Sequence, residues 1–198
     1  DISTSKNDEL YIEKIAKAII KNQLQNVNLL VRTSPAEDPI RFAPMVDQFP
    51  FIKWNYPKWK LSRLGHQEEW SQRIPTTEDI IDLRNILEYS DVNVNMLSTM
   101  SLDFMQFDKP VVNPVFGNQT NGLYNDQRFL NYKHIQHVVD SKASKIAKNE
   151  KELIDYCNLY LNEPTIDQLQ REHLLKLQVS KPLKGTGKRI SKVLFEWI

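Results

Sequence analysis

Three polar residues at helical spacing are the strongest candidates for chemistry in this sequence. Ser98 and Thr99 follow a short apolar stretch, and Asp103 comes one helical turn after Thr99. Backbone N–H groups at a helix start lack helical acceptors, and the helix dipole makes that end positive, so such a start can bind phosphate. A carboxylate one turn later can hold the two hydroxyls of a ribose. The spacing equally fits an ordinary N-cap, with Asp103 only complementing the helix dipole.

Arg32 is the second candidate, because it follows a compact apolar run at residues 27–31 that predicts a strand. Ligands of open parallel sheets bind beyond the carboxyl ends of the strands. From spacing alone, Arg32 either neutralises a diphosphate or pairs with Glu37 or Asp38.

The motifs GxGxxG, GxxxxGK[ST], HExxH and CxxC are absent, which argues against a dinucleotide dehydrogenase, a P-loop enzyme and a zinc site. We expect no bound metal. The single cysteine, Cys157, lies in an apolar helical pattern and is interpreted as a buried thiol.

The overall charge excludes broad classes of partner. The 198 residues include 26 Lys and Arg against 25 Asp and Glu, a formal net charge of +1. A general nucleic-acid or anionic-membrane surface needs a clear basic excess, so we expect no nucleic-acid partner. No apolar run approaches the roughly 18 residues of a membrane span. The chain begins at Asp1 without a methionine or a signal-like segment, so we expect it to be either processed or excised from a longer protein.

The elements that must position these residues alternate along the chain. Strands are predicted at 27–31, 51–54, 91–95 and 110–115. Helices are predicted at 8–22, 41–48, from 76, at 98–107, 149–161, 165–178 and from 189, with a flexible break at 184–187. Residues 55–75 are interpreted as a long loop, and 130–144 are ambiguous. Short apolar strands between amphipathic helices predict an α/β fold, a Rossmann-like doubly wound parallel sheet in one domain with C-terminal helices.

The region around Ser98 resembles the donor site of glycosyltransferases with the two-domain GT-B fold. Residues 86–95, 97–103 and 107–113 carry this similarity, and related patterns occur in CDP-glycerol-type polyol-phosphate transferases and UDP-sugar 2-epimerases. Residues 30–35 resemble a strand that ends in Arg or Lys before His-Pro, with Thr33 and Ser34 in place of the His. Residues 152–164 and 187–190 resemble the closing helices of such domains.

The resemblance implies that residues 1–198 form the C-terminal, nucleotide-sugar-binding half of a GT-B enzyme. Arg32, Ser98, Thr99 and Met100 would then bind the donor diphosphate. Asp103, where the family often has Glu, would hold the ribose. Trp54 and Tyr56 would recognise the base, although buried core aromatics are an equally good interpretation.

The same resemblance implies transfer of a sugar from a nucleotide-diphosphate sugar to a glycan or similar acceptor, without metal or other cofactor. The helix dipole and basic side chains would stabilise the leaving diphosphate. The acceptor-activating base is expected in the missing N-terminal domain, so no catalytic residue is assigned and the fragment is expected to be inactive alone. The apolar segment 183–198 packs either toward that domain or on its own.

The resemblance implies a role in a bacterial polysaccharide pathway. It also implies a location in the cytoplasm or at the inner face of the membrane, through peripheral contact of the full-length protein. Two alternatives remain open. One is a polyol-phosphate transferase or nucleotide-sugar epimerase on the same scaffold, and the other is a non-catalytic Rossmann-like interaction module.

Overall fold

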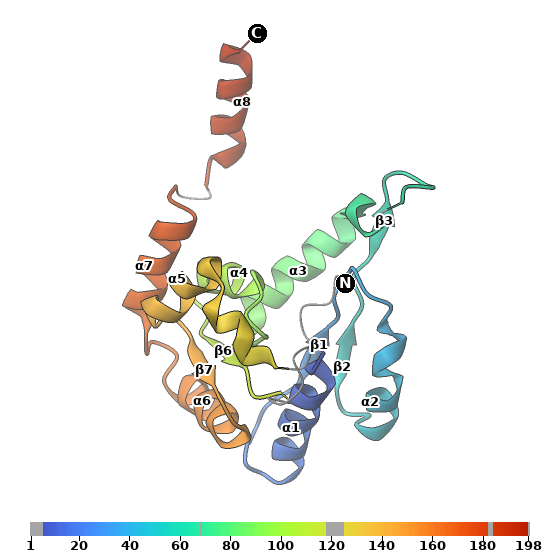
Figure 1. Ribbon diagram of the computed structural model, residues 1–198, viewed down its shortest axis with the longest axis vertical. Coiled ribbons are helices and arrows are strands. Elements are labelled where there is room, and N and C mark those ends of the chain that lie inside the picture. Colours follow the sequence, from blue (N-terminus) through green and yellow to red (C-terminus); the bar gives the residue numbers. More distant parts are fainter. Residues whose placement is uncertain (1–5, 68, 118–124, 182–183, 198) are drawn as a thin grey trace.

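Helices make up most of the fold, and short strands lie among them (Figure 1). The computed structural model describes residues 6–67, 69–117, 125–181 and 184–197. The α-helices are α1 Asp8–Ile20, α2 Ala43–Gln48, α3 Thr77–Tyr89, α4 Met100–Gln106, α5 Lys133–Ser141, α6 Glu150–Asn162, α7 Gln168–Gln178 and α8 Thr186–Glu196. The strands are β1 Leu30–Arg32, β2 Lys53–Asn55, β3 Trp59–Leu61, β4 Arg73–Pro75, β5 Asn93–Val94, β6 Val111–Pro114 and β7 Lys145–Ala147. Three 3₁₀ helices are η1 Pro39–Phe42, η2 Glu69–Gln72 and η3 Asp126–Asn131.

The parallel strands form two small sheets. β1 pairs with β2, and β5, β6 and β7 pair in that order. The mixed α/β class with parallel strands is as predicted, but within the described residues backbone pairing does not join the strands into one doubly wound sheet. One apolar cluster nevertheless spans both sheets, because Leu29 before β1 packs with Val94 and Val112 against α1 and α6. β6 is buried along its whole length, as expected for a parallel strand covered on both faces.

The carboxyl ends of both parallel sheets meet at the start of α1. Arg41, which follows β1 along the chain, forms an ion pair of 2.6 Å with Asp8 in the first turn of α1. Directly after β6, the backbone N–H of Gly117 donates to the Tyr11 hydroxyl, also in the first turn, over 3.0 Å. The two sheets therefore present their carboxyl ends to a common region, where ligands of parallel α/β folds bind.

Helix caps follow the sequence signals closely. The Thr76 hydroxyl accepts the Asp79 amide at the start of α3. Asn149 accepts the Glu152 amide at the start of α6, and the Glu152 carboxylate reaches back to Asn149 Nδ2 and to the Lys148 amide. Asp79 occupies the position where a capping-box carboxylate would reach back in α3, but its carboxylate has other partners, described below.

Three predicted segments differ from the structure. Residues 55–75 were expected to form a loop, but β3 and β4 pair antiparallel within them and project from the body (Figure 1). The ambiguous stretch 130–144 contains the end of η3 and helix α5, and strand β7 follows it. The break at 184–187 is shorter than expected, since Gly185 has a left-handed φ of +85° and α8 begins at Thr186. β3, β4 and β7 lack the longer apolar or alternating segments that predicted the other strands at 27–31, 51–54, 91–95 and 110–115.

α8 stands away from the rest of the described chain, at the top of Figure 1. None of its residues is buried, so the predicted packing of this segment on its own domain is not seen for the described residues. Ile198 lies outside the described residues. Across the described part of the chain, no helix combines the length and the apolar composition that a membrane crossing requires.

Candidate functional site

The turn between β5 and α4 holds the predicted diphosphate residues together. Asn95 directly follows β5, and its Oδ1 accepts the Ser98 amide at 2.7 Å. Ser98 Oγ accepts the Met100 amide at 3.3 Å. Leu97 between them has φ +50°, a left-handed conformation that is rare for a leucine and that gives the turn its shape. Ser98, Thr99 and Met100 therefore lie on one constrained turn, as the sequence predicted.

A buried amide of β6 supports this turn. Asn113 is fully buried, and its Nδ2 donates to the Asn95 carbonyl at 2.8 Å and to Asn95 Oδ1 at 3.2 Å. The same nitrogen lies 3.3 Å from the hydroxyl of Ser101, which is also buried. Asn113 Oδ1 accepts no hydrogen bond within the described residues. Sequence reasoning placed Asn113 in a strand but did not assign it to the site, although a lone amide in a buried strand was a usable signal.

Asp103 lies one turn beyond Thr99, and its backbone N–H donates to the Thr99 carbonyl at 3.4 Å. Burial raises the pKa of its carboxyl. Among the described residues, no side chain or amide donates to that carboxylate. A half-buried carboxylate without a partner is unfavourable for stability, and such groups concentrate at functional sites.

Arg32 is held by partners that the sequence did not indicate. Its guanidinium donates to both carboxylate oxygens of Asp79, at 3.0 and 2.9 Å, and to Asn55 Oδ1. The predicted alternative partners are engaged elsewhere: Glu37 pairs with Arg41 at 3.2 Å, and Asp38 accepts the Ile40 amide at 3.0 Å. No hydrogen bond or ion pair joins Arg32 to the Ser98 turn within the described residues.

Asp79 links three segments of the chain. Besides Arg32, its carboxylate accepts the Lys58 amide at 2.8 Å and the Trp59 indole N–H at 2.7 Å. The side chain is only 2% exposed. Burial opposes ionisation, but the hydrogen bonds from Lys58, Arg32 and Trp59 outweigh it, so the pKa of Asp79 lies below its usual value. Asp79 therefore fixes Arg32 and the base of the β3–β4 hairpin onto α3.

The two predicted base-recognition residues lie in different environments. Trp54 in β2 packs against the apolar cluster of Ala16, Met45, Phe49 and Ile52. Its ring is stacked with that of Tyr56, with centroids 6.3 Å apart and planes 8° apart. Trp54 is thus partly a core residue, whereas Tyr56 is 44% exposed and available to a ligand.

Lys148 is a further cation at this edge that sequence reasoning missed. It follows β7 directly, and its side chain forms no ion pair within the described residues. Because β5 and β7 flank β6 in a parallel sheet, their carboxyl ends lie roughly 10 Å apart. A pocket of about 380 Å³ beside β7 is lined by Leu130, Val139, Ile146, Lys148, Glu152 and Tyr156.

A buried Tyr–Asp pair lies next to the turn. The Tyr11 hydroxyl donates to Asp126 Oδ2, and Asn7 Nδ2 donates to the same oxygen at 3.0 Å. Tyr11 packs with Met96, and Leu97 lies against the same cluster. Burial is the main cause that raises the pKa of Tyr11 far above its usual value, and burial also raises the pKa of Asp126. Both groups are almost fully inaccessible, so they stabilise the loops here rather than contact a ligand.

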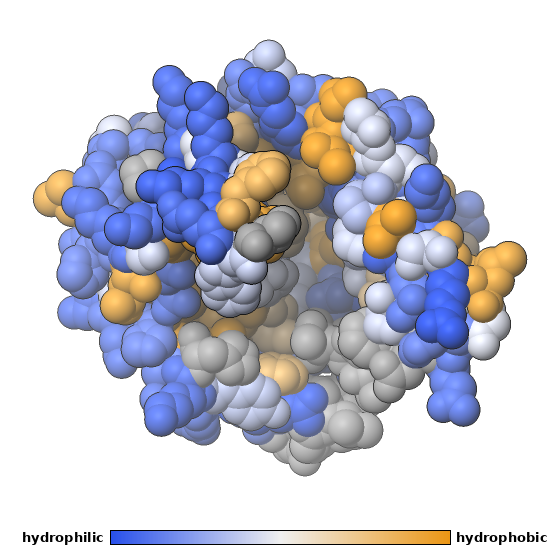
Figure 2. All heavy atoms as spheres, turned by 90° about the horizontal axis from the view of Figure 1, so that it is seen from above, coloured by the Kyte–Doolittle hydropathy of each residue, from blue (hydrophilic) through white to orange (hydrophobic). Residues whose placement is uncertain are grey.

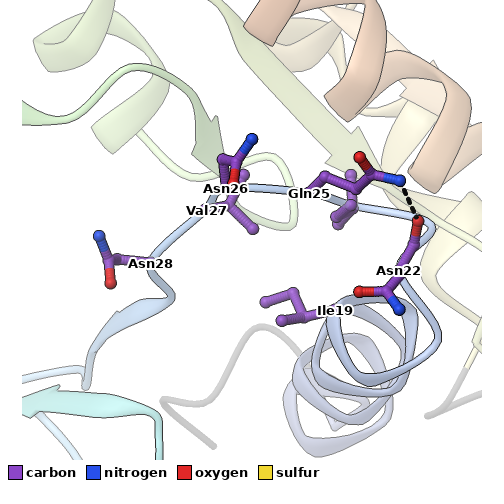
Figure 3. Close-up of a pocket in the computed structure, with 7 residues that line it drawn as sticks. Ile19, Asn22, Gln25, Asn26, Val27 and Asn28 are labelled. Atoms are coloured by element: carbon purple, nitrogen blue, oxygen red, sulfur yellow. Dashed lines mark hydrogen bonds between the residues drawn. The ribbon is translucent and has the colours of Figure 1, made fainter.

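Seen from above, the molecule is hollowed near its centre, and both hydrophobic and hydrophilic side chains border the hollow (Figure 2). A different pocket, of about 650 Å³, lies at the amino end of β1 and is therefore on the wrong side of the sheet for the predicted site. Figure 3 shows the Gln25 side chain there, whose Nε2 donates to the Asn22 backbone carbonyl over 3.2 Å.

Neither metal chemistry nor cysteine chemistry is indicated by the described residues. Among them, no group of three His, Cys, Asp or Glu side chains is placed to hold a metal ion. Cys157 is buried in α6, and burial raises the pKa of its thiol to about 12. The predicted buried thiol is confirmed.

Comparison with known proteins gives no family. No protein-family model matches the chain, and no curated protein matches it in sequence at a significant level.

Proposed function

We propose that this chain is the donor-binding half of a metal-independent glycosyltransferase with a GT-B, Rossmann-like architecture. The observation that carries the proposal is the constrained Ser98–Thr99–Met100 turn at the carboxyl end of β5. One turn later lies the Asp103 carboxylate, which accepts no hydrogen bond from the residues that the structure describes. A diphosphate needs N–H and O–H donors, and a ribose diol needs a carboxylate. Among the described residues, the Thr99 amide and the hydroxyls of Ser98 and Thr99 donate to no acceptor and are available to a diphosphate, and Asp103 lies one turn later.

In the proposed reaction, the bond between the anomeric carbon of the sugar and the diphosphate oxygen breaks as a bond from an acceptor oxygen to that carbon forms. The acceptor proton passes to a base outside this chain. The residues of this chain act on the leaving diphosphate, whose negative charge grows as the bond breaks. The turn itself is held in place, because the Ser98 amide donates to Asn95 Oδ1 and Asn113 donates to the Asn95 carbonyl. The Thr99 amide and the Ser98 and Thr99 hydroxyls therefore need little reorganisation as that charge develops.

A cation near the diphosphate is the next requirement. Arg32 was expected to fill this role, but Asp79 and Asn55 hold its guanidinium. Lys148, at the end of β7 and without an ion pair among the described residues, supplies a positive charge on the same edge. We therefore propose that Lys148 contributes charge compensation, while Arg32 shapes the base of the site through Asp79.

The engagement of Arg32 also favours a second candidate, a non-catalytic Rossmann-like interaction module. In that case Arg32 and Asp79 are purely structural, and the Ser98 turn is an ordinary helix start. A polyol-phosphate transferase or a nucleotide-sugar epimerase would use the same donor contacts, and a preference for CDP over UDP separates the first of these from a UDP-sugar enzyme.

Calorimetric titration of the chain with UDP, GDP, CDP, ADP and dTDP tests the proposal. We expect one diphosphate to bind, and Thr99→Ala and Asp103→Ala each to weaken it by about tenfold, the equivalent of one lost hydrogen bond to a charged group. Asp47→Ala, an exposed carboxylate on α2, is the matched control and should not change the affinity.

Titration with the corresponding nucleoside monophosphates separates the contacts to the diphosphate from the contact to the ribose. Thr99→Ala should weaken the diphosphate more than the monophosphate, whereas Asp103→Ala should weaken both equally because the ribose is common to them. If no nucleotide binds to the chain or to the longer protein that contains it, the interaction module is the better assignment.

A further inference from the structure

We propose that α8 binds the surface of an anionic lipid bilayer. This inference is independent of the nucleotide site, because no residue of α8 is buried against the rest of the described chain. At 100° per residue, the exposed Phe195 lies on the side of Lys188 and Lys192. Four other apolar residues recur with a spacing of three and four and form one stripe along the helix. They are Ile190, Val193, Leu194 and Trp197, with exposed fractions between 48% and 84%.

The opposite side of the helix is basic. Lys188 and Lys192 lie about half a turn from the apolar stripe at 100° per residue, and Arg189 flanks it. The only acidic residue of α8, Glu196, lies 3.6 Å from Lys192 across an exposed pair that contributes little. Apolar stripe and basic face together form a helix that lies in a membrane interface rather than crossing it. At 11 residues α8 is roughly 16 Å long, which is too short to span a bilayer.

The charge distribution along the chain favours an anionic bilayer over other binding partners of α8. Residues 181–198 contain five basic residues and one acidic residue, a local charge of +4 in a chain whose formal net charge is +1. Residues 1–180 therefore carry a net charge of −3. The overall balance, which argued against a membrane surface, conceals this local excess. Two copies of α8 docked on each other would bring like charges together, whereas an anionic bilayer accepts both the apolar stripe and the charge.

Trp197 strengthens the assignment. It continues the apolar stripe just beyond the last residue of α8 and is 84% exposed. Tryptophan is enriched at membrane–water interfaces, because its ring is apolar and its N–H can hydrogen-bond to headgroups or water. A side chain of this size left exposed at the end of an amphipathic helix fits that environment.

Vesicle flotation of the whole chain tests the proposal. We expect binding to vesicles of equal parts phosphatidylcholine and phosphatidylglycerol, no binding to phosphatidylcholine alone, and release as NaCl rises from ~0.1 to ~0.5 M. Lys188→Glu with Lys192→Glu should reduce the partition coefficient by about thirtyfold or more, because each basic residue near the surface contributes about fivefold. Leu194→Asp should also abolish binding.

A matched control has the same change of charge away from α8. Lys60→Glu with Lys151→Glu alters two exposed lysines and should leave vesicle binding unchanged. Thermal unfolding of every variant should match that of the unmodified chain, since α8 buries nothing in the described structure. Equal binding to both vesicle types, equal loss in the control, or dimerisation through α8 without vesicle binding would overturn the proposal.

Discussion

Replacing Asp79 with alanine is the most informative test of how the edge of the site is built. The substitution leaves the Arg32 guanidinium, whose side chain is only 14% exposed, without its counter-charge. It also leaves the Lys58 amide and the Trp59 indole N–H without their acceptor. Removing one partner of a buried ion pair costs about 4 kcal/mol. In a chain of this length, that corresponds to a fall in Tm of about 12 °C.

Circular dichroism melts and urea titrations measure this loss. Glu78→Gln is the control, because Glu78 is the neighbouring carboxylate in α3 but is 68% exposed in its pair with Lys58. The control should lower Tm by no more than about 2 °C. Arg32→Met combined with Asp79→Leu should restore part of the stability, because no uncompensated charge is then buried. A fall in Tm of less than about 4 °C for Asp79→Ala would refute the assignment of Asp79 as the link between these segments.

The same variant has a defined pH dependence. The pKa of Asp79 is below its usual value in the folded chain, so its contribution to the free energy of unfolding is fully present above the unfolded pKa of about 4. It is lost as the pH falls through the lower, folded pKa. The difference in unfolding free energy between the unmodified chain and Asp79→Ala should be constant from about pH 8 to 5 and shrink below about pH 4. A difference that grows on acidification would contradict this sign.

Three further predictions concern other buried groups. Because burial raises the pKa of Asp126, its ionisation destabilises the fold as pH rises, so Asp126→Asn should raise Tm relative to the unmodified chain more at neutral pH than at about pH 4. Cys157, buried and with its pKa raised to about 12, should react with a thiol reagent only at the rate of unfolding, measured by absorbance with and without urea. Asn113→Ala should weaken binding of the nucleoside diphosphate by about tenfold, whereas the control Asn162→Ala, at an exposed position, should not. Equal affinities of the two variants for the nucleotide would show that the Asn113 amide does not hold the Ser98 turn.

The sequence predicted best the elements whose signals repeat. α1 and α6 have three turns of apolar spacing, and α6 also has the Asn149 cap, so their limits were predicted within two residues at each end. β3, β4 and β7 have one or two apolar residues each and lack the longer apolar or alternating segment that marked the other strands. The turn at Ser98 could be predicted because all its residues are adjacent in sequence. The pairing of Arg32 with Asp79 joins residues 47 positions apart, and spacing alone contains no information on such a contact.

The shared carboxylate of Asp79 also has an evolutionary consequence. One side chain receives donors from the end of β1, from the start of the hairpin and from the Trp59 indole, so no single substitution among these positions is neutral. Homologous chains that lose the acid at this position should therefore have lost the arginine at position 32 as well, and a change of ring at position 59 should accompany them. Arg32, Trp59 and Asp79 should thus covary as a triplet, whatever nucleotide or partner each homologue binds.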